Sequence, residues 1–337
     1  MAAALERREP AGAVPVWEIE FHAWDAASGQ HVVLGRELER LTAAGQDRAL
    51  HTNAAVMLEV SEALHFAALT GPGAYWEQAP GQLAYYVLPG EARFRQFEIL
   101  SREAGDLMLV ANSGGVIGAD YSIEFCTQLF EAPEEVDEYC RRTLQSGVET
   151  AKRFRDLGAG AVFAAADIAD NSGPFFNPDQ MRRFILPYLN EWAERCKAMG
   201  LYTILHTDGQ LTAYVDAIAD TAVDALQAID PVAGMDLCET RRIAGERLCL
   251  CGNIDCGVLL RGTPESVFAA TRSLLLAAKD GGGLVLGASN AVQPEVPLSN
   301  YRAMIAAWSE HGGYSRSRCG ARLHRVSRKL YSKPVLE

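Results

Sequence analysis

Short apolar runs alternate along the chain with longer segments that have helical periodicity. The apolar runs lie at 14–21, 66–70, 107–113, 160–167, 202–206, 225–230, 247–253 and 284–288. Most are bounded by Gly, Pro or Asp, and they show no clean alternation of apolar and polar residues. Such runs are typical of strands that are covered on both faces, so the pattern predicts a parallel sheet.

The segments between these runs carry the start and stop signals of helices. The clearest covers 178–199, where Asn177 can act as the N-terminal cap. Because Pro187 lies inside this segment, we expect a kink or a break just before it. Two further helices are predicted over about 133–157 and 264–280.

Eight consecutive β/α units without a linker predict an α/β protein that forms a single (β/α)8 TIM barrel. That fold occupies about 250 residues plus insertions, which suits a chain of 337 residues. We expect one barrel domain over 1–337, with an elaborated loop at about 75–103 and a basic C-terminal tail at about 315–337. An open, doubly wound sheet is the alternative architecture.

The charge composition argues against nucleic acid and membranes as partners. The formal net charge is −12, from 43 acidic and 31 basic residues, so the protein repels nucleic acid and anionic membrane surfaces. The N-terminus has no apolar core of signal-peptide length, and no apolar run is long enough to span a membrane. Eight dispersed Cys fit free thiols in a reducing compartment, so we expect a cytoplasmic protein.

The most informative run is Ile204-Leu-His206-Thr-Asp208-Gly209, where an apolar strand ends. Side chains at i and i+2 of a strand point to the same face, so His206 and Asp208 should converge. A His and a carboxylate in contact can bind a metal, transfer a proton or anchor a polar substrate.

Polar residues also follow the other predicted strands, at the end of a barrel where catalytic residues lie. We assign catalytic roles to His206, Asp208, Asp167 and Asp255. The candidate substrate-binding residues are Glu18, Glu20, His22, Asn112, Asn171, Gln227, Asn253, Ser289 and Asn290. Cys251 and Cys256 flank Asn253 and Asp255 and are candidate soft ligands or nucleophiles.

Several of these residues occur in an ordered set of motifs. The set comprises Asp167-Ile-Ala-Asp-Asn-Ser-Gly-Pro, His206-Thr-Asp-Gly, Gly252-Asn-Ile-Asp255 and Ser289-Asn290. It resembles the uroporphyrinogen decarboxylase superfamily over nearly the whole chain, from the first predicted strand to about Trp308. The resemblance implies a (β/α)8 barrel.

That superfamily contains decarboxylases and corrinoid-dependent methyltransferases. The decarboxylases carry an Arg-rich first-strand segment that grips a polycarboxylate substrate, whereas this chain has Glu18 and Glu20 there. Carboxylates would repel such a substrate. The chain is more similar to the methyltransferase branch, which moves a methyl group between a corrinoid protein and a thiol or similar acceptor.

The thiol-methylating members hold zinc through a His-x-Cys pair and a later Cys. Here only His206 is retained, since Asp208 and Asn290 occupy the two Cys positions. A zinc site of His206, Asp208 and Cys256 is one expectation, with Cys251 or Glu20 as other completing ligands. Alternatively the metal is lost, and His206 and Asp208 act as an acid–base pair.

The resemblance therefore implies a corrinoid-linked methyltransferase or demethylase component. Its partners would be a corrinoid protein or free cobalamin and a small-molecule methyl donor or acceptor. The alternatives are a decarboxylase or lyase acting on a smaller acid, and a non-catalytic corrinoid- or tetrapyrrole-binding protein. A homodimer is compatible with the exposed helices of a barrel.

Overall fold

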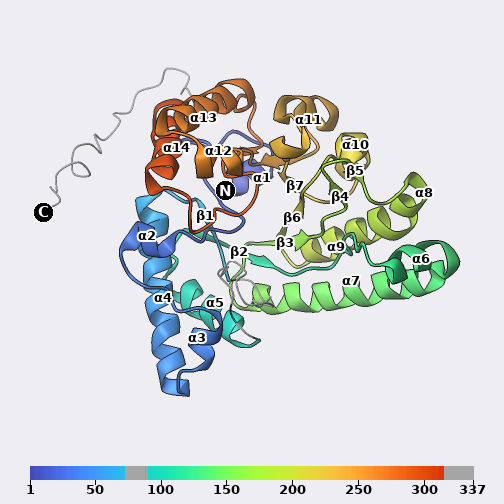
Figure 1. Ribbon diagram of the computed structural model, residues 1–337, viewed down its shortest axis with the longest axis horizontal. Coiled ribbons are helices and arrows are strands. Elements are labelled where there is room, and N and C mark those ends of the chain that lie inside the picture. The colour runs from blue at the N-terminus through green and yellow to red at the C-terminus, as the bar shows by residue number, and fades with distance from the viewer. Residues whose placement is uncertain (73–87, 89, 315–337) are drawn as a thin grey trace, which may run out of the picture.

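The computed structural model describes residues 1–72, 88 and 90–314. Its centre is a seven-stranded parallel sheet with the order β1-β2-β3-β6-β7-β8-β9 (Figure 1). The strands are β1 (Ala68–Thr70), β2 (Met108–Asn112), β3 (Ala161–Ala165), β6 (Tyr202–Thr207), β7 (Ala225–Ala228), β8 (Cys249–Cys251) and β9 (Leu284–Val285). Each lies within or overlaps a predicted run, which confirms the parallel sheet.

The first predicted strand closes the sheet into a barrel. Val16 forms parallel bridges to Phe66, which leads into β1, and to Leu286, which follows β9. The Ala67 N–H donates to the Val16 carbonyl at 2.8 Å. The segment is otherwise not a regular strand, because Pro15 offers no N–H and the backbone bends at Ile19. The predicted α/β barrel is confirmed.

Fourteen α-helical segments connect and surround the described strands. They are α1 (Ala2–Leu5), α2 (Trp24–Ser28), α3 (Gly35–Glu39), α4 (Ala43–Ala63), α5 (Ala92–Glu103), α6 (Ile123–Glu131), α7 (Pro133–Asp156), α8 (Pro178–Gln180), α9 (Leu186–Ala198), α10 (Val215–Ala219), α11 (Leu237–Ala244), α12 (Cys256–Arg261), α13 (Pro264–Ala278) and α14 (Leu298–His311). None of the described helices is both long and apolar enough to cross a bilayer.

The predicted helix boundaries follow from local side-chain chemistry. Asn177 and Thr263 each form a capping box, in which the cap side chain and the third helical residue satisfy each other's backbone N–H groups. The break expected before Pro187 is a π-helical turn, Met181–Ile185, between α8 and α9. A π-turn accommodates the missing N–H of the proline.

The barrel interior is a separate apolar cluster enclosed by the strands. It consists of Ala4, Leu5, Trp17, Ile19, Ala68, Val110, Ala161, Phe163, Ile204, Ala225, Cys249, Cys251 and Val285. Ile204 belongs to this interior, whereas its neighbour Leu205 packs in the outer core between strands and helices. The alternation of the strand therefore places His206 on the interior side, one step above Ile204.

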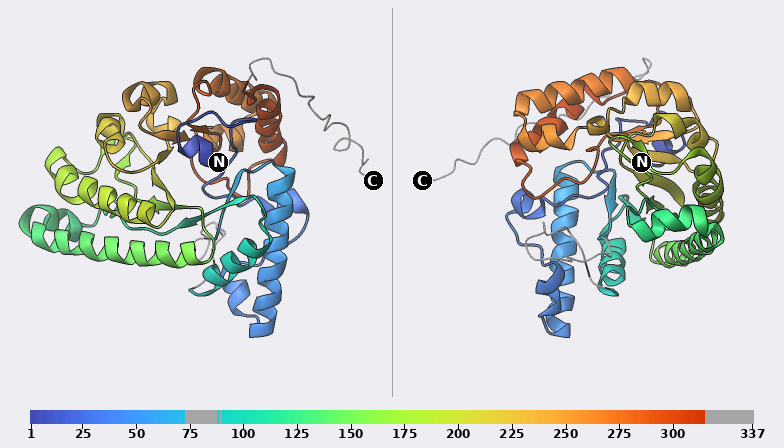
Figure 2. Two further views of the ribbon diagram at one scale, coloured as in Figure 1. Left: turned by 180° about the vertical axis from the view of Figure 1, so that it is seen from behind. Right: turned by 45° about the vertical axis from the view of Figure 1, so that its right-hand side comes forward.

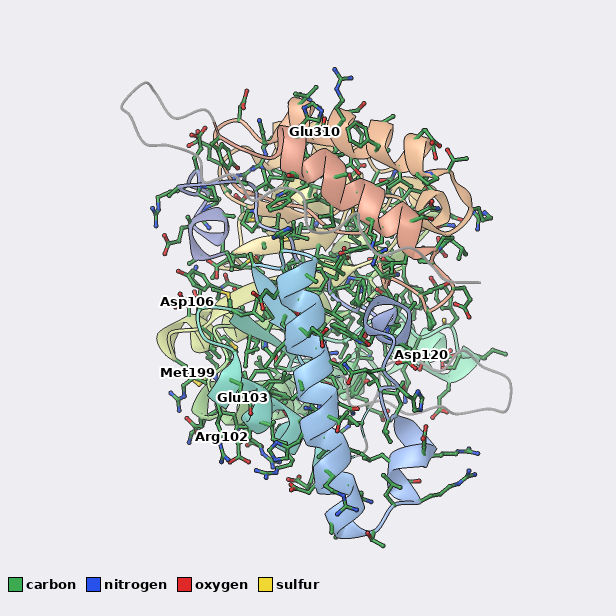
Figure 3. The ribbon with its side chains drawn as sticks, turned by 90° about the vertical axis from the view of Figure 1, so that its left-hand side faces the viewer. Arg102, Glu103, Asp106, Asp120, Met199 and Glu310 are labelled. Carbon is green, nitrogen blue, oxygen red and sulfur yellow. The ribbon has the colours of Figure 1, made fainter. Side chains whose placement is uncertain are left out.

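The loop predicted at about 75–103 needs one correction, because its last part is the helix α5. Phe94, Phe97 and Leu100 are spaced by three residues and are buried, which is a helical pattern. The helix lies beside α4, which projects along one side of the barrel (Figures 2 and 3). Most of the rest of that loop, and the tail at 315–337, lie outside the described residues, so the single domain over 1–337 stays a prediction.

A close backbone contact joins α7 to the loop after β2. A Cβ atom on Gly147, which lies within α7, would come 2.3 Å from the Cα of Gly115. Gly115 has a φ of 120°, a conformation that L-residues rarely adopt. The approach of α7 to the sheet at this point therefore depends on the absence of a side chain.

We expect Gly147→Ala to destabilise the protein, although alanine favours a helix over glycine by about 1 kcal/mol. The added methyl must displace backbone atoms, and overpacking of this kind costs roughly 1–3 kcal/mol. Urea denaturation followed by circular dichroism measures the change. Ser146→Ala, at the exposed neighbouring position, is the control and should be neutral or slightly stabilising; an equally stable Gly147→Ala protein would contradict the packing argument.

Candidate functional site

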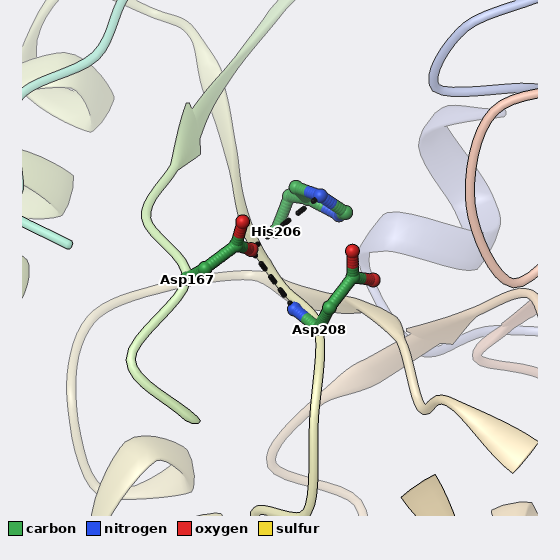
Figure 4. Close-up of side chains that lie close together, drawn as sticks. All are labelled: Asp167, His206 and Asp208. Carbon is green, nitrogen blue, oxygen red and sulfur yellow. Dashed lines mark hydrogen bonds and ion pairs between the residues drawn. The ribbon is translucent and has the colours of Figure 1, made fainter. Parts of the chain in front are cut away.

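The carboxyl ends of β3 and β6 bring three ionisable side chains together. His206 lies in β6, Asp208 follows it, and Asp167 follows β3 (Figure 4). One ligand atom from each of them lies within 4.8 Å of the others. The i and i+2 residues of β6 therefore share a face, as the sequence pattern predicts, and the neighbouring strand adds Asp167.

The imidazole of His206 is held in one orientation by Gln227 of β7. His206 Nδ1 and Gln227 Oε1 form a short hydrogen bond. Gln227 Nε2 donates to the carbonyls of Ala288 and Ser289, both at 3.4 Å, which assigns its oxygen to the histidine side. Nδ1 therefore donates to Gln227, and Nε2 is the nitrogen left for another partner. Nε2 lies 3.9 Å from Asp167 Oδ1.

Asp208 is a half-buried carboxylate with incomplete hydrogen bonding. Its Oδ2 accepts a hydrogen bond from Asn290 Nδ2, and its backbone N–H donates to Asp167 Oδ1 at 3.0 Å. Its Oδ1 is buried and has no hydrogen-bond partner among the described residues. Burial raises the pKa of Asp208 to about 6; His206 opposes this rise, while the carboxylates of Asp167 and Asp230 add to it.

The chemistry of this cluster fits a divalent cation. An imidazole nitrogen and two carboxylates are a donor set that zinc accepts in catalytic sites. A cation would satisfy the unpartnered Asp208 oxygen and offset the repulsion between Asp208 and Asp167. The hydrogen bond from Gln227 to the other imidazole nitrogen is the outer contact by which metal-binding histidines are normally oriented. His206 Nε2, Asp208 and Asp167 are thus the residues that would hold the ion.

Cys256 lies outside this cluster, so the metal set expected from the sequence is corrected. Its Sγ lies 3.5 Å from Ser289 Oγ, which donates to it, and 3.7 Å from the Ala291 carbonyl. Burial raises the pKa of the Cys256 thiol to about 11. A neutral thiol is a poor ligand, and Asp167 takes the place assigned to it. Cys251 is buried in the barrel interior, where burial also raises its pKa.

Asp255 and Asn253 are engaged by the backbone around the end of β8. Asp255 Oδ1 accepts hydrogen bonds from the N–H groups of Gly257 and Val258 and so caps α12. Asn253 Nδ2 donates to the Ile229 carbonyl at 2.7 Å. Both contacts shape the loops beside the cluster. The catalytic role assigned to Asp255 and the substrate contact assigned to Asn253 stay predictions.

Glu18 is buried where the first segment meets the chain after β9. Its Oε2 accepts from the Ala288 N–H and its Oε1 from the Tyr301 hydroxyl, each at 2.8 Å. Burial raises the pKa of Glu18 to about 8, against these two hydrogen bonds. The side chain joins the first segment to the chain after β9 and to α14, which is a structural use of a residue assigned to substrate binding.

Three other assigned residues line one small pocket in the mouth. Glu20, His22 and Asn112 share it with three aromatic side chains. The complete lining is Ile19, Glu20, Phe21, His22, Trp24, Thr70, Gly71, Pro72, Asn112 and Phe163. His22 Nε2 lies 3.0 Å from Glu20 Oε2. Polar groups over apolar walls can orient a small molecule, so this pocket is the candidate subsite for one.

The remaining assigned residues differ in exposure. Ser289 is buried beside Cys256, and Asn171 is exposed in the turn between β4 (Ala169–Asp170) and β5 (Gly173–Pro174), which form an antiparallel hairpin. Phe163 also lines the pocket and is not among the residues predicted from the sequence. The alternation that places Ala161 inside the barrel could have found it, because Phe163 is two residues further along β3.

Together, a closed parallel barrel and a titratable cluster at the carboxyl ends of its strands are the architecture of (β/α)8-barrel enzymes. The family model "Uroporphyrinogen decarboxylase (URO-D)" matches residues 116–311, more than half of the 337-residue chain. The chain belongs to the URO-D family, as its motifs predict.

Relatives from both branches of the family are similar to it. A methylcobamide:CoM methyltransferase from Methanosarcina barkeri is 26% identical over 185 residues, 55% of this chain and 50% of the relative. A uroporphyrinogen decarboxylase from Coxiella burnetii is 29% identical over 155 residues, 43% of this chain and 41% of the relative. The matches thus span half or less of the curated relatives' length.

Among solved structures, a methyltransferase from Methanosarcina mazei has a TM-score of 0.66 and 18% sequence identity. The match covers 91% of this chain and 96% of that one. At this identity the likeness shows the fold, and it supports the barrel described above.

We expect Asp208→Asn to stabilise the metal-free protein at pH 8 by about 1–2 kcal/mol, after allowance for solvent screening. The folded-state pKa of about 6 lies above the ordinary 3.8. The stability that Asp208 contributes is therefore present below pH 3.8 and is lost as the pH rises through 6, whereas asparagine stays neutral. Urea denaturation in a chelator at several pH values measures the difference.

The gain from Asp208→Asn should shrink steadily toward pH 4. Asp106→Asn, at an exposed site near α5 (Figure 3), is the matched control and should show no such trend. A gain that does not depend on pH would contradict the raised pKa of Asp208.

Proposed function

We propose that this protein is a corrinoid-linked methyltransferase or demethylase component. It would move a methyl group between a small molecule or thiol and a corrinoid. The observation that carries the proposal is the His206 imidazole, which Gln227 orients so that Nε2 faces Asp167 beside Asp208. Similarity to the Methanosarcina barkeri methylcobamide:CoM methyltransferase supports this branch of the family.

We propose zinc as the metal, held by His206 Nε2 and the carboxylates of Asp208 and Asp167. When bound, zinc lowers the pKa of a thiol and keeps it as a nucleophilic thiolate. The residues of this chain position the reacting groups. Gln227 holds the imidazole, and Asn290 holds the Asp208 carboxylate. Methyl transfer is a displacement at carbon, so this alignment governs the rate.

Without zinc, the same residues would act as general acids and bases. His206 Nε2 would accept the proton that the acceptor releases as its bond to the methyl carbon forms. The bond from that carbon to the leaving atom breaks in the same step. The pocket of Glu20, His22 and Asn112, which Phe163 of β3 also lines, would orient the small molecule. This is the acid–base form of the proposal.

The charges of the mouth favour methyl transfer over decarboxylation. Besides burial, the side chains that shift the pKa of Asp208 among the described residues are His206, Asp167, Asp230 and Asn290, and none of them is a Lys or an Arg. A polycarboxylate substrate would need Lys or Arg there. A purely binding protein would have no use for the unpartnered, half-buried carboxylate oxygen, which is costly to keep.

We further propose a cytoplasmic location, with a corrinoid protein or free cobalamin as the partner. All seven cysteines among the described residues are unpaired, including the buried Cys140 and Cys196. Free thiols persist in a reducing compartment. A reduced environment also suits a thiol acceptor.

The purified protein should contain about one zinc per chain and should demethylate methylcobalamin when a thiol acceptor is added. Elemental analysis gives the metal, and the visible spectrum of the corrinoid follows the loss of the methyl group. A parallel assay with uroporphyrinogen tests the decarboxylase alternative. If the corrinoid spectrum changes although the protein contains no zinc, the acid–base form of the proposal is correct. If the spectrum changes with none of the thiols, methyl transfer to thiols is refuted.

Gln227→Leu should reduce zinc affinity or demethylation by roughly 10–100-fold, because leucine cannot accept the hydrogen bond from Nδ1 that orients His206. His206→Ala should abolish both. His51→Ala, at an exposed position on α4, is the control and should behave as the wild type. Circular dichroism checks the fold, and a fully active His206→Ala protein would remove this residue from the mechanism.

A further inference from the structure

Away from the titratable cluster, an exposed apolar surface covers α6 and the residues just before it. Tyr121, Ile123 and Phe130 have exposed fractions of 61%, 86% and 72%, among the highest for large apolar side chains in the described residues. They line a shallow groove together with neighbouring side chains. We call this groove the α6 outer face, and it consists of Tyr121, Ile123, Cys126, Thr127, Phe130 and Glu131.

The fold does not need these apolar side chains. Phe125 and Leu129 form the buried side of α6, and the helical period places Ile123 and Phe130 on the opposite side. The helix lies at the edge of the molecule in more than one view (Figures 1 and 2). Burial of one side alone therefore anchors α6, and the second apolar side is left for another contact.

The α6 outer face begins at the rim of the mouth. The Tyr121 hydroxyl donates to Asp170 Oδ2 at 3.1 Å, and its ring packs edge-on against Phe175 at 4.9 Å. Asp170 ends β4, three residues after Asp167 of the titratable cluster, and its carbonyl accepts from the Gln210 N–H. A molecule that covers the mouth from this side therefore meets Tyr121 first and α6 next.

The size and the charge of this surface indicate the kind of partner. Three side chains exposed to this degree present on the order of 400 Å² of largely apolar area, the size of the largest apolar patch on a typical monomer, and such patches are often functional. A permanent dimer buries more, so the area favours a transient contact. Glu131 within the groove and its sequence neighbours Asp120 and Glu124 beside it are exposed. The partner should therefore bring an apolar spot surrounded by Lys or Arg.

We propose that the α6 outer face is the docking surface for a protein that carries the corrinoid to the mouth. The inference rests on the proposed function, since a protein-bound corrinoid needs a surface beside the site to hold its carrier. A transient contact also suits a carrier that must leave after each methyl transfer. Free methylcobalamin would enter the mouth without touching Ile123 or Phe130.

The test compares two methyl donors with the double variant Ile123→Ser/Phe130→Ser. The donors are free methylcobalamin and the corrinoid protein encoded nearest to this chain in its genome, purified with methylcobalamin bound. We expect the variant to raise the KM for the carrier by about tenfold and to leave the kinetics with free methylcobalamin unchanged. Leu276→Ser, at an exposed apolar position on α13, is the matched control and should change neither.

Each other outcome has a distinct meaning. Two outcomes would overturn the docking proposal and leave the proposed function standing, provided that the wild type accepts free methylcobalamin. In the first, the variant has the same KM for the carrier as the wild type. In the second, the wild-type KM for the carrier is no lower than the KM for free methylcobalamin. If the wild type uses neither donor, the proposed function fails first. If sedimentation shows a dimer that the variant converts to monomers, the α6 outer face is a contact between two copies of this chain, which also overturns the proposal.

Discussion

The register of three parallel strands determines what the site can do. In the sheet, Ala165 of β3 pairs with His206 of β6, and His206 pairs with Gln227 of β7. Because neighbouring residues of a parallel ladder lie side by side with the same orientation, His206 and Gln227 must present their side chains on the same face. A shift of one residue would turn the imidazole into the outer core. The hydrogen bond at Nδ1, the orientation of Nε2 and the approach of Asp167 all follow from this pairing.

The electrostatics of the mouth follow from the burial of a carboxylate. Burial raises the pKa of Asp208 to about 6, and the nearby Asp167 and Asp230 carboxylates add to the rise, while one of its oxygens has no hydrogen-bond partner among the described residues. Structural ion pairs elsewhere avoid this cost, as in the contact of Lys197 with Asp224 at 2.9 Å. Carboxylates kept in an unfavourable state are concentrated at functional sites, where a ligand or a proton completes them.

The sequence predicted the barrel because its signals are local and repeated. Strands that are covered on both faces have continuous apolar sequences. The capping residues Asn177 and Thr263 indicate where two of the helices begin. The convergence of His206 with Asp208 also follows from a two-residue period. What could not be predicted depends on partners far away in the chain. The residues around Glu18 do not indicate its hydrogen bond with Tyr301, which lies 283 residues later. Likewise, the sequence around Cys256 does not indicate that its thiol points toward the Ala291 carbonyl.

The assignment of α5 to a loop has a similar cause. Its apolar residues are few, and the charged residues between them hide the helical period until the packing against α4 is known. In the same way, the sequence gives no sign that Asp208 and Asn290 are in contact, because they lie 82 residues apart. Asn290 Nδ2 donates to Asp208 Oδ2, so the residues at the two positions where the resemblance implies Cys form one hydrogen-bonded pair.

A buried acid, Glu18, lies at the seam of the barrel, which is the place where the first segment meets the chain after β9. The first segment, the end of β9 and α14 meet around an acid that is mostly uncharged at neutral pH, since its pKa lies near 8. In more alkaline solution this acid gains a charge inside an apolar wall, and the stability that its neutral form contributes is lost. The closure of the barrel between the first segment and the chain after β9 would therefore be weakest in alkaline solution, and acid would not weaken it in this way.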